Sequence, residues 1–144
     1  MSGFAEALEM LCRDIPQKIR EQMAQRCVRV SNELKNAEIE ILSAGGSGGR
    51  TYPLPGGGSY TASAPREVPA VRTGAYKGSW TPSSETSGNV FTSRLDTNHT
   101  VNGYILGELL EGGTSKMAPR PHVDKILKKA EPKAVRIYDE PYSI

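Results

Sequence analysis

The sequence predicts an α+β fold: a long N-terminal helix packed on a small antiparallel sheet, an extended arm rich in glycine and proline, and a C-terminal helix. Three observations lead to this prediction. Apolar or small residues recur every three or four positions from Phe4 to Ile41, glycines and prolines cluster between Ser43 and Pro69, and side chains alternate in character from Asn89 to Leu95. A chain of 144 residues suits one domain, here 1–144 with 43–72 as the arm.

The N-terminal helical pattern is interrupted once, at Pro16. Proline is tolerated in the first turn of a helix but not in its interior, and Asp14 is a suitable N-cap just before it. We therefore predict a short helix over residues 3–13 and a long one over residues 15–42, ended by Ala44-Gly45-Gly46. The spacing also fits a coiled coil, but small residues in the apolar stripe favour packing on a sheet.

The arm combines flexible and stiff sequence. Its glycine runs, 45–49 and 56–58, alternate with Tyr52-Pro53-Leu54-Pro55 and Tyr60-Thr-Ala-Ser-Ala-Pro65, which favour extended backbone. Such a segment is either a disordered linker or an arm that becomes ordered only against a partner. The spaced residues Tyr52, Leu54 and Tyr60 favour the arm, because disordered linkers tend to lack spaced aromatic side chains.

Short elements follow the arm. Residues 73–80 are predicted to form a turn or a single helical turn that leads into a strand, and residues 89–95 a half-exposed strand. Residues 101–110 fit either a strand or a strand followed by a short helix, and the pattern does not decide between them.

The C-terminal region begins with a second helical pattern. Val123, Ile126, Leu127 and Ala130 mark a helix that Pro132 is expected to end. Residues 133–138 then alternate in the manner of a last strand, with Val135 and Ile137 on one side.

Between the segment 101–110 and this helix lies the turn Gly112-Gly113-Thr114-Ser115-Lys116-Met117-Ala118-Pro119-Arg120-Pro121. Two glycines, followed by two prolines on either side of an arginine, exclude regular structure. A connection that only reversed the chain could be far shorter. Taken alone, the turn could be a ligand-binding loop. The absence of a catalytic or metal-binding partner in the sequence, together with the arm and Thr73-Gly74, instead favours a shaped contact surface between subunits.

No residue pattern indicates an enzyme. His99 and His122 lie in a turn and at a helix start, and we interpret them as ordinary surface histidines. The spacing of His and Cys residues supports no metal site, Ser115 and Lys116 are adjacent and poorly placed to share a proton, and no glycine run carries the Lys-Ser/Thr of a phosphate loop. We expect no catalytic residue, no cofactor and no metal.

The cysteines and the hydropathy indicate the compartment in which the chain is expected. Cys12 and Cys27 fall on or near one helical stripe, too far apart for a disulfide within a helix, so we interpret them as small buried apolar residues of a reduced compartment. No run is apolar enough to span a membrane, and no signal peptide is visible.

Charge is uneven although the net value is only +2. Basic residues are in excess in the arm and in the C-terminal helix, with an acidic block between them. They could make sequence-independent phosphate contacts, although such faces are commonly just solvated. The candidates for facing a channel or DNA are Arg50, Arg66, Lys125, Lys128 and Lys129.

Four stretches together resemble the neck proteins of tailed phages, which are known as head–tail joining, tail-completion or minor tail component proteins. They are Tyr60–Pro65, Pro69-Ala-Val-Arg-Thr-Gly74, Ser79-Trp80, and Leu109 through the turn to Pro121. The resemblance spans most of the chain. The chain departs from the family at Gly112 and at His122, where an aromatic residue is common.

The resemblance implies a structural protein of the virion, assembled in the cytoplasm of the bacterial host and built from a long helix on an antiparallel sheet. Such proteins form a ring, hexameric or dodecameric, between the portal complex and the tail, next to a connector, tail terminator or tail tube, and the genome passes through its channel. We expect the arm and the turn to contact neighbouring subunits through Tyr52, Leu54, Tyr60, Pro65, Arg72, Thr73, Gly74, Thr114, Ser115, Lys116, Met117, Pro119, Arg120 and Pro121.

This interpretation predicts that a chain lacking residues 45–58 folds as a monomer but no longer assembles. Two alternatives stay open. A DNA-binding module without sequence specificity would bind DNA with a steep dependence on salt. A tail-assembly chaperone would be absent from purified virions.

Overall fold

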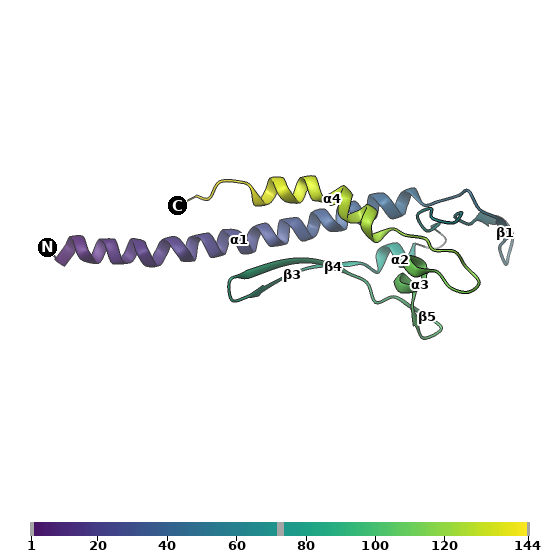
Figure 1. Ribbon diagram of the computed structural model, residues 1–144, viewed down its shortest axis with the longest axis horizontal. Helices are drawn as coiled ribbons and strands as arrows, with labels where there is room; N and C mark the ends of the chain where they lie inside the picture. Colours follow the sequence, from purple (N-terminus) through teal and green to yellow (C-terminus); the bar gives the residue numbers. More distant parts are fainter. Residues whose placement is uncertain (1, 72–73, 144) are drawn as a thin grey trace.

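The computed structural model describes residues 2–71 and 74–143, and Figure 1 shows an elongated molecule organised along one helix. This helix, α1 (Ser2–Ala44), forms the long axis. The C-terminal helix α4 (Val123–Tyr138) lies along one side of α1, and the strands β3 (Thr81–Ser87) and β4 (Val90–Asp96) lie along the opposite side. The mixed α+β architecture predicted from the sequence is confirmed.

The helix α1 continues through Pro16, so the predicted break into two helices is wrong. A proline inside a helix removes one intrahelical hydrogen bond and crowds the carbonyl four residues earlier, which can kink a helix without ending it. The stripe of apolar residues keeps its helical period on both sides of Pro16, and a single long helix preserves that period.

The helix α4 likewise continues through Pro132, and the strand predicted for residues 133–138 is wrong. Ile126, Ala130 and Ile137 are buried, and their spacings of four and seven residues place them on one face of a helix. Val135 was expected on the same side as Ile137, but its side chain is 52% exposed. The short alternating pattern was therefore the weaker signal.

The predicted sheet consists of three separate two-stranded ribbons. In the longest, β3 pairs antiparallel with β4 from Thr81↔Asp96 to Ser87↔Val90, which confirms the strand expected for residues 89–95. The short ribbons are β1 (Thr51–Pro53) with β2 (Ser59–Thr61), and β5 (Thr100–Val101) with β6 (Tyr104–Ile105). A helical turn, α2 (Ala75–Gly78), precedes β3, as predicted.

Of the two alternatives for residues 101–110, the structure has the strand followed by a short helix, α3 (Leu106–Gly112). The centre of the core joins α1 to α4. Ala37, Ile126 and Ala130 are buried there, and Leu34, Ile41 and Leu95 pack around them. Cys27 is also buried, as expected for a small apolar residue, whereas the side chain of Cys12 lies outside the described part of the structure.

A small core leaves a large surface. The chain exposes 9630 Å². A compact monomer of 15.6 kDa is expected to expose about 7,300 Å². The exposed surface therefore exceeds that of a typical compact monomer by about a third.

Candidate subunit-interface site

The arm doubles back on itself. Near its base, the Gly46 amide donates to the Val68 carbonyl at 2.9 Å, and the Gly49 amide donates to the Ala62 carbonyl at 2.9 Å. Further out, β1 and β2 pair from Thr51↔Thr61 to Pro53↔Ser59. The arm was expected to be extended, but its two halves instead run antiparallel and satisfy each other's backbone groups.

The far end of the arm is the tip hairpin, which we define as residues 51–61. Tyr52 and Tyr60 stack with ring centroids 5.6 Å apart, and Tyr52 is 40% exposed. The Leu54 amide donates to the Gly58 carbonyl at 3.0 Å and closes the turn. Figure 1 places β1 beyond the end of α1, so this hairpin extends away from the rest of the chain.

The turn after α3 has a fixed shape of its own. The Thr114 amide donates to the Met117 carbonyl at 2.8 Å, and the Met117 amide donates back to the Thr114 carbonyl at 3.3 Å. Gly113 has a φ of +72°, and a side chain there would approach the Met117 carbonyl oxygen to 2.8 Å. Ser115 and Lys116 are exposed at the end of this turn.

Arg120 joins the turn to the arm within one chain. Its Nε donates to the Ser63 hydroxyl at 2.8 Å, and its Nη2 donates to the Ser63 carbonyl at 2.9 Å. Its Nη1 donates to the Ala118 carbonyl at 2.7 Å, and the Arg66 amide donates to the Pro119 carbonyl at 2.9 Å. The two segments predicted to contact neighbours therefore contact each other, and the guanidinium of Arg120 is used internally.

His122 is fully buried, so its interpretation as a surface histidine is wrong. Its Nδ1 lies 2.8 Å from the Arg120 carbonyl oxygen and its Nε2 lies 2.6 Å from the Tyr76 hydroxyl. Because a carbonyl oxygen only accepts, Nδ1 carries a proton and donates to the Arg120 carbonyl, and Nε2 forms the second hydrogen bond with the Tyr76 hydroxyl. The ring also packs edge-on against Tyr76 and Trp80, with centroids 5.6 and 6.0 Å away.

The carboxylate of Glu111 completes this cluster. Its Oε1 accepts from the His122 amide at 2.6 Å and from the Val123 amide at 2.5 Å, and so it caps the N-terminus of α4 from α3. Burial, together with the negative charge of Glu111, raises the pKa of Tyr76 above its ordinary value of 10.0. The Tyr76 hydroxyl therefore stays protonated at neutral pH.

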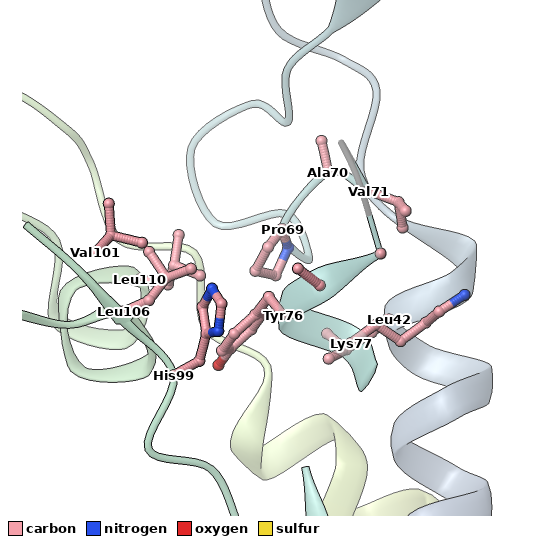
Figure 2. Close-up of a pocket in the computed structure, with 12 residues that line it drawn as sticks. Leu42, Pro69, Ala70, Val71, Tyr76, Lys77, His99, Val101, Leu106 and Leu110 are labelled. Carbon is pink, nitrogen blue, oxygen red and sulfur yellow. The ribbon is translucent and has the colours of Figure 1, made fainter. Parts of the chain in front are cut away.

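A cavity of about 490 Å³ lies beside this cluster and is shown in Figure 2. Most of its lining is apolar and comes from four parts of the chain: Leu42 at the end of α1, Pro69 and Val71 at the base of the arm, Tyr76 on α2, and Leu106 and Leu110 on α3. His99 supplies a polar ring to it. No sequence pattern pointed to this cavity.

The other predicted interface residues are distributed as follows. Pro65 and Pro119 are exposed, and Leu54 and Pro121 are half-buried. Gly74 has a φ of +80° and is the N-cap of α2, and glycine suits this position because it adopts a positive φ without strain. Arg72 and Thr73 lie outside the described residues.

The lysines of α4 are engaged within the chain. Lys129 pairs with Glu40 of α1 at 3.1 Å, Lys128 with Asp124 at 2.9 Å, and Lys125 donates to the Arg66 carbonyl at 3.4 Å. The candidates Arg50 and Arg66 are exposed. Lys129 thus helps to hold α4 against α1, and the ion pairs of Lys128 and Lys129 reduce the positive charge that α4 offers to DNA.

The part of the chain that the structure describes contains neither a metal centre nor a membrane helix. Within residues 2–71 and 74–143, no three His, Cys, Asp or Glu side chains are grouped to hold a metal ion. Over the same ranges, no helix combines the length and the apolar character needed to cross a bilayer.

Comparisons of this chain with protein-family models, curated proteins and solved structures each find no match. The geometry and the sequence motifs therefore carry the functional argument.

Sequence reasoning missed Ser63, Tyr76, Glu111 and Trp80, which hold the turn in place. Ser63, Trp80 and Glu111 lie in the stretches that carry the resemblance, but those stretches do not show which residues they contact, because their partners lie far away along the chain. His122 packs among aromatic rings in the structure, those of Tyr76 and Trp80.

Proposed function

We propose that this chain is a structural subunit of a ring in the neck of a tailed-phage virion, where the ring completes the tail and joins it to the portal complex. The identity of the ring rests on the sequence resemblance, and chiefly on the Gly-Thr-Ser-Lys-Met-Ala-Pro-Arg-Pro turn from Gly113 to Pro121. The observation that best supports assembly into a ring is the size of the exposed surface.

The excess surface of about 2,300 Å² is close to what two interfaces would cover on one subunit, at about 1,100 Å² each. A subunit of a closed ring has two such faces, one toward each neighbour, and they are different surfaces. The symmetry of phage tails favours six subunits. Exposed apolar side chains away from the core, such as Tyr104 at 65% and Val101 at 42%, are consistent with faces that become covered.

The alternative of a free DNA-binding module gains no support from the lysines of α4, because Lys129 and Lys133 pair with Glu40 and Glu33 of α1. A ring with DNA in its channel still needs some basic residues toward the lumen. Arg50 and Arg66, both exposed, are the remaining candidates.

The test begins with the purified chain. Light scattering after size exclusion, from micromolar to millimolar concentration, should detect a closed oligomer, and negative-stain images should show rings. The chain should also be present in purified virions of its phage, and particles that lack it should contain unjoined heads and tails. A chain that stays monomeric at millimolar concentration, or that is absent from virions, would overturn the proposal.

The structure also changes the design of the arm deletion. Removing residues 45–58 would cut the hydrogen bonds of Gly46 and Gly49 at the base of the arm as well as the tip hairpin. Substitutions confined to Tyr52 and Leu54 leave that base intact, and so they separate assembly from folding.

A further inference from the structure

The cavity beside α2 is large enough and apolar enough to hold side chains from another molecule. Its volume of about 490 Å³ falls within the range of sites that bury small ligands. Leu42, Tyr76, Leu106 and Leu110 are among the residues of its wall, and the labelled side chains in Figure 2 come to it from separate segments. An open apolar cavity of this kind gains stability when an apolar group displaces its water.

The tip hairpin has the complementary chemistry. Residues 51–61 contain no charged side chain, and they carry the stacked pair Tyr52 and Tyr60 together with Leu54. The three glycines of its turn, residues 56–58, all have positive φ, and their surroundings are open. The hairpin is therefore a narrow, uncharged projection with an aromatic side.

The hairpin and the cavity belong to one chain but lie apart. The cavity lining comes from α1, the arm base, α2, α3 and the segment 99–101, and it includes no residue of the described hairpin. The hydrogen bonds of Gly46 and Gly49 join the two halves of the arm, and the hydrogen bond from the Arg66 amide to the Pro119 carbonyl holds the arm against its own chain. Figure 1 accordingly shows β1 at the far end of the molecule, beyond α1.

We propose that the tip hairpin of one copy inserts Tyr52 and Leu54 into the cavity of the next copy. This inference rests on the proposed ring. A projection and a recess at different places on one chain make a heterologous contact, and repeating that contact closes a ring when the rotation between copies permits it. Each subunit then has one face that inserts and one that receives, which agrees with the two interfaces that the excess surface provides.

A second copy is the occupant best supported by these observations. The projection and the recess occur in equal number on every subunit, so a ring leaves none unfilled. His99 gives the recess one polar ring that can pair with an inserted tyrosine hydroxyl, as buried tyrosines require. The absence of charge on residues 51–61 also means that no ion has to be buried without a partner.

Cross-linking tests the contact directly. A chain carrying both Leu54→Cys and Val101→Cys, in a Cys12→Ser background, should form a ladder of covalent species up to the ring size with a short bis-maleimide. An equimolar mixture of the two single variants should stop at dimers. The matched control pairs Val90→Cys with Val101→Cys, because Val90 is 65% exposed but lies at the β3–β4 turn. A ladder no stronger than this control would overturn the inference.

Disruption tests it independently. Tyr52→Ala with Leu54→Ala should weaken association by about 30-fold or more, as expected for anchor residues at the centre of an interface. Ala70→Phe, which fills the cavity from the arm base, should weaken association similarly. Val90→Ala should leave association within about twofold, the scatter expected for a substitution outside the contact.

The outcomes separate the two proposals. If the parent chain forms rings and the Tyr52/Leu54 and Ala70 variants form them equally well, the insertion is wrong and the ring stands. If the parent chain remains monomeric at millimolar concentration, both proposals fail. Unchanged circular dichroism and unchanged unfolding of the diluted monomers are the readouts that exclude misfolding of the variants.

Discussion

The turn from Gly112 to Pro121 and the tip hairpin differ in where their side chains make contacts. The turn directs its polar groups inward, with Arg120 bonded to Ser63 and Ala118, and with its carbonyl bonded to buried His122. The hairpin satisfies its own backbone but leaves Tyr52 exposed. Apolar surface left in water gains on association, whereas hydrogen bonds already made within a chain do not. We therefore interpret the turn as a scaffold and the hairpin as the contact.

Replacing Arg120 should have the largest effect on the stability of the monomer. Arg120→Ala should lower the free energy of unfolding of the monomer by about 2–3 kcal/mol, because two polar groups of Ser63, which is only 7% exposed, lose their charged donor. Urea unfolding of the diluted monomer measures the change.

The matched control is Arg66→Ala, since this side chain is exposed, and its effect should stay within about 0.5 kcal/mol. Arg120→Lys should restore little, because an ammonium cannot reproduce the fork of donors. If Arg120→Ala were as mild as Arg66→Ala, the turn would not depend on its anchor.

The buried pair Tyr76–His122 tests whether the hydrogen bonds beside the turn also stabilise the monomer. Tyr76→Phe and His122→Phe should each cost about 1–2 kcal/mol of unfolding free energy, because each leaves a buried polar atom without its partner. The double variant should cost less than the sum of the two, since both polar groups are then gone.

The aromatic character of the cluster makes this cycle informative. Phenylalanine at position 122 keeps a ring beside Trp80. Additive effects in urea unfolding would mean that the short Tyr76–His122 hydrogen bond is energetically unimportant, and the cluster would then be held by packing alone.

Glu38 supplies a contrasting polar group, one that is buried with few partners. Its side chain is fully buried, the Lys35 ammonium lies 2.9 Å from its Oε2, and the positive charge of Lys77 also acts on it. Burial raises the pKa of Glu38 above 4.5, and the neighbouring Lys35 opposes that shift. The folded state therefore binds the proton more tightly than the unfolded state, so this contribution to stability is complete below pH 4.5 and is lost as pH rises through the folded pKa.

Glu38→Gln removes the ionisable group, and with it the loss of stability that Glu38 causes as pH rises. The variant should become more stable relative to the parent as pH rises from 4 toward 7, when both are followed by urea unfolding at each pH. Glu131→Gln on the exposed face of α4 is the control, and its difference from the parent should stay nearly flat over the same range. A relative stability that falls with pH would show that Lys35 outweighs burial.

The sequence predicted the elements that depend on long periodic patterns. The stripe from Phe4 to Ile41 predicted α1 and the burial of Cys27, and alternation predicted β4. Pro16 and Pro132 led to wrong boundaries, because the rule for proline is local while the apolar faces on either side act cooperatively. The burial of His122 could not be predicted, since Tyr76 lies 46 residues away along the chain.

The smallest expected effect concerns the hairpin itself. Tyr52→Ala in the diluted monomer should change the free energy of unfolding by no more than about 0.5 kcal/mol, because the residue is 40% exposed and its ring stacks on Tyr60 within the same hairpin. The same substitution should have its main effect on assembly, measured by light scattering. Arg120→Ala should show the reverse, with a large loss of monomer stability and an assembly defect only where the arm base has loosened. If Tyr52→Ala instead destabilised the monomer as much as Arg120→Ala does, the hairpin would belong to the scaffold, and the division of these two regions into scaffold and contact would not hold.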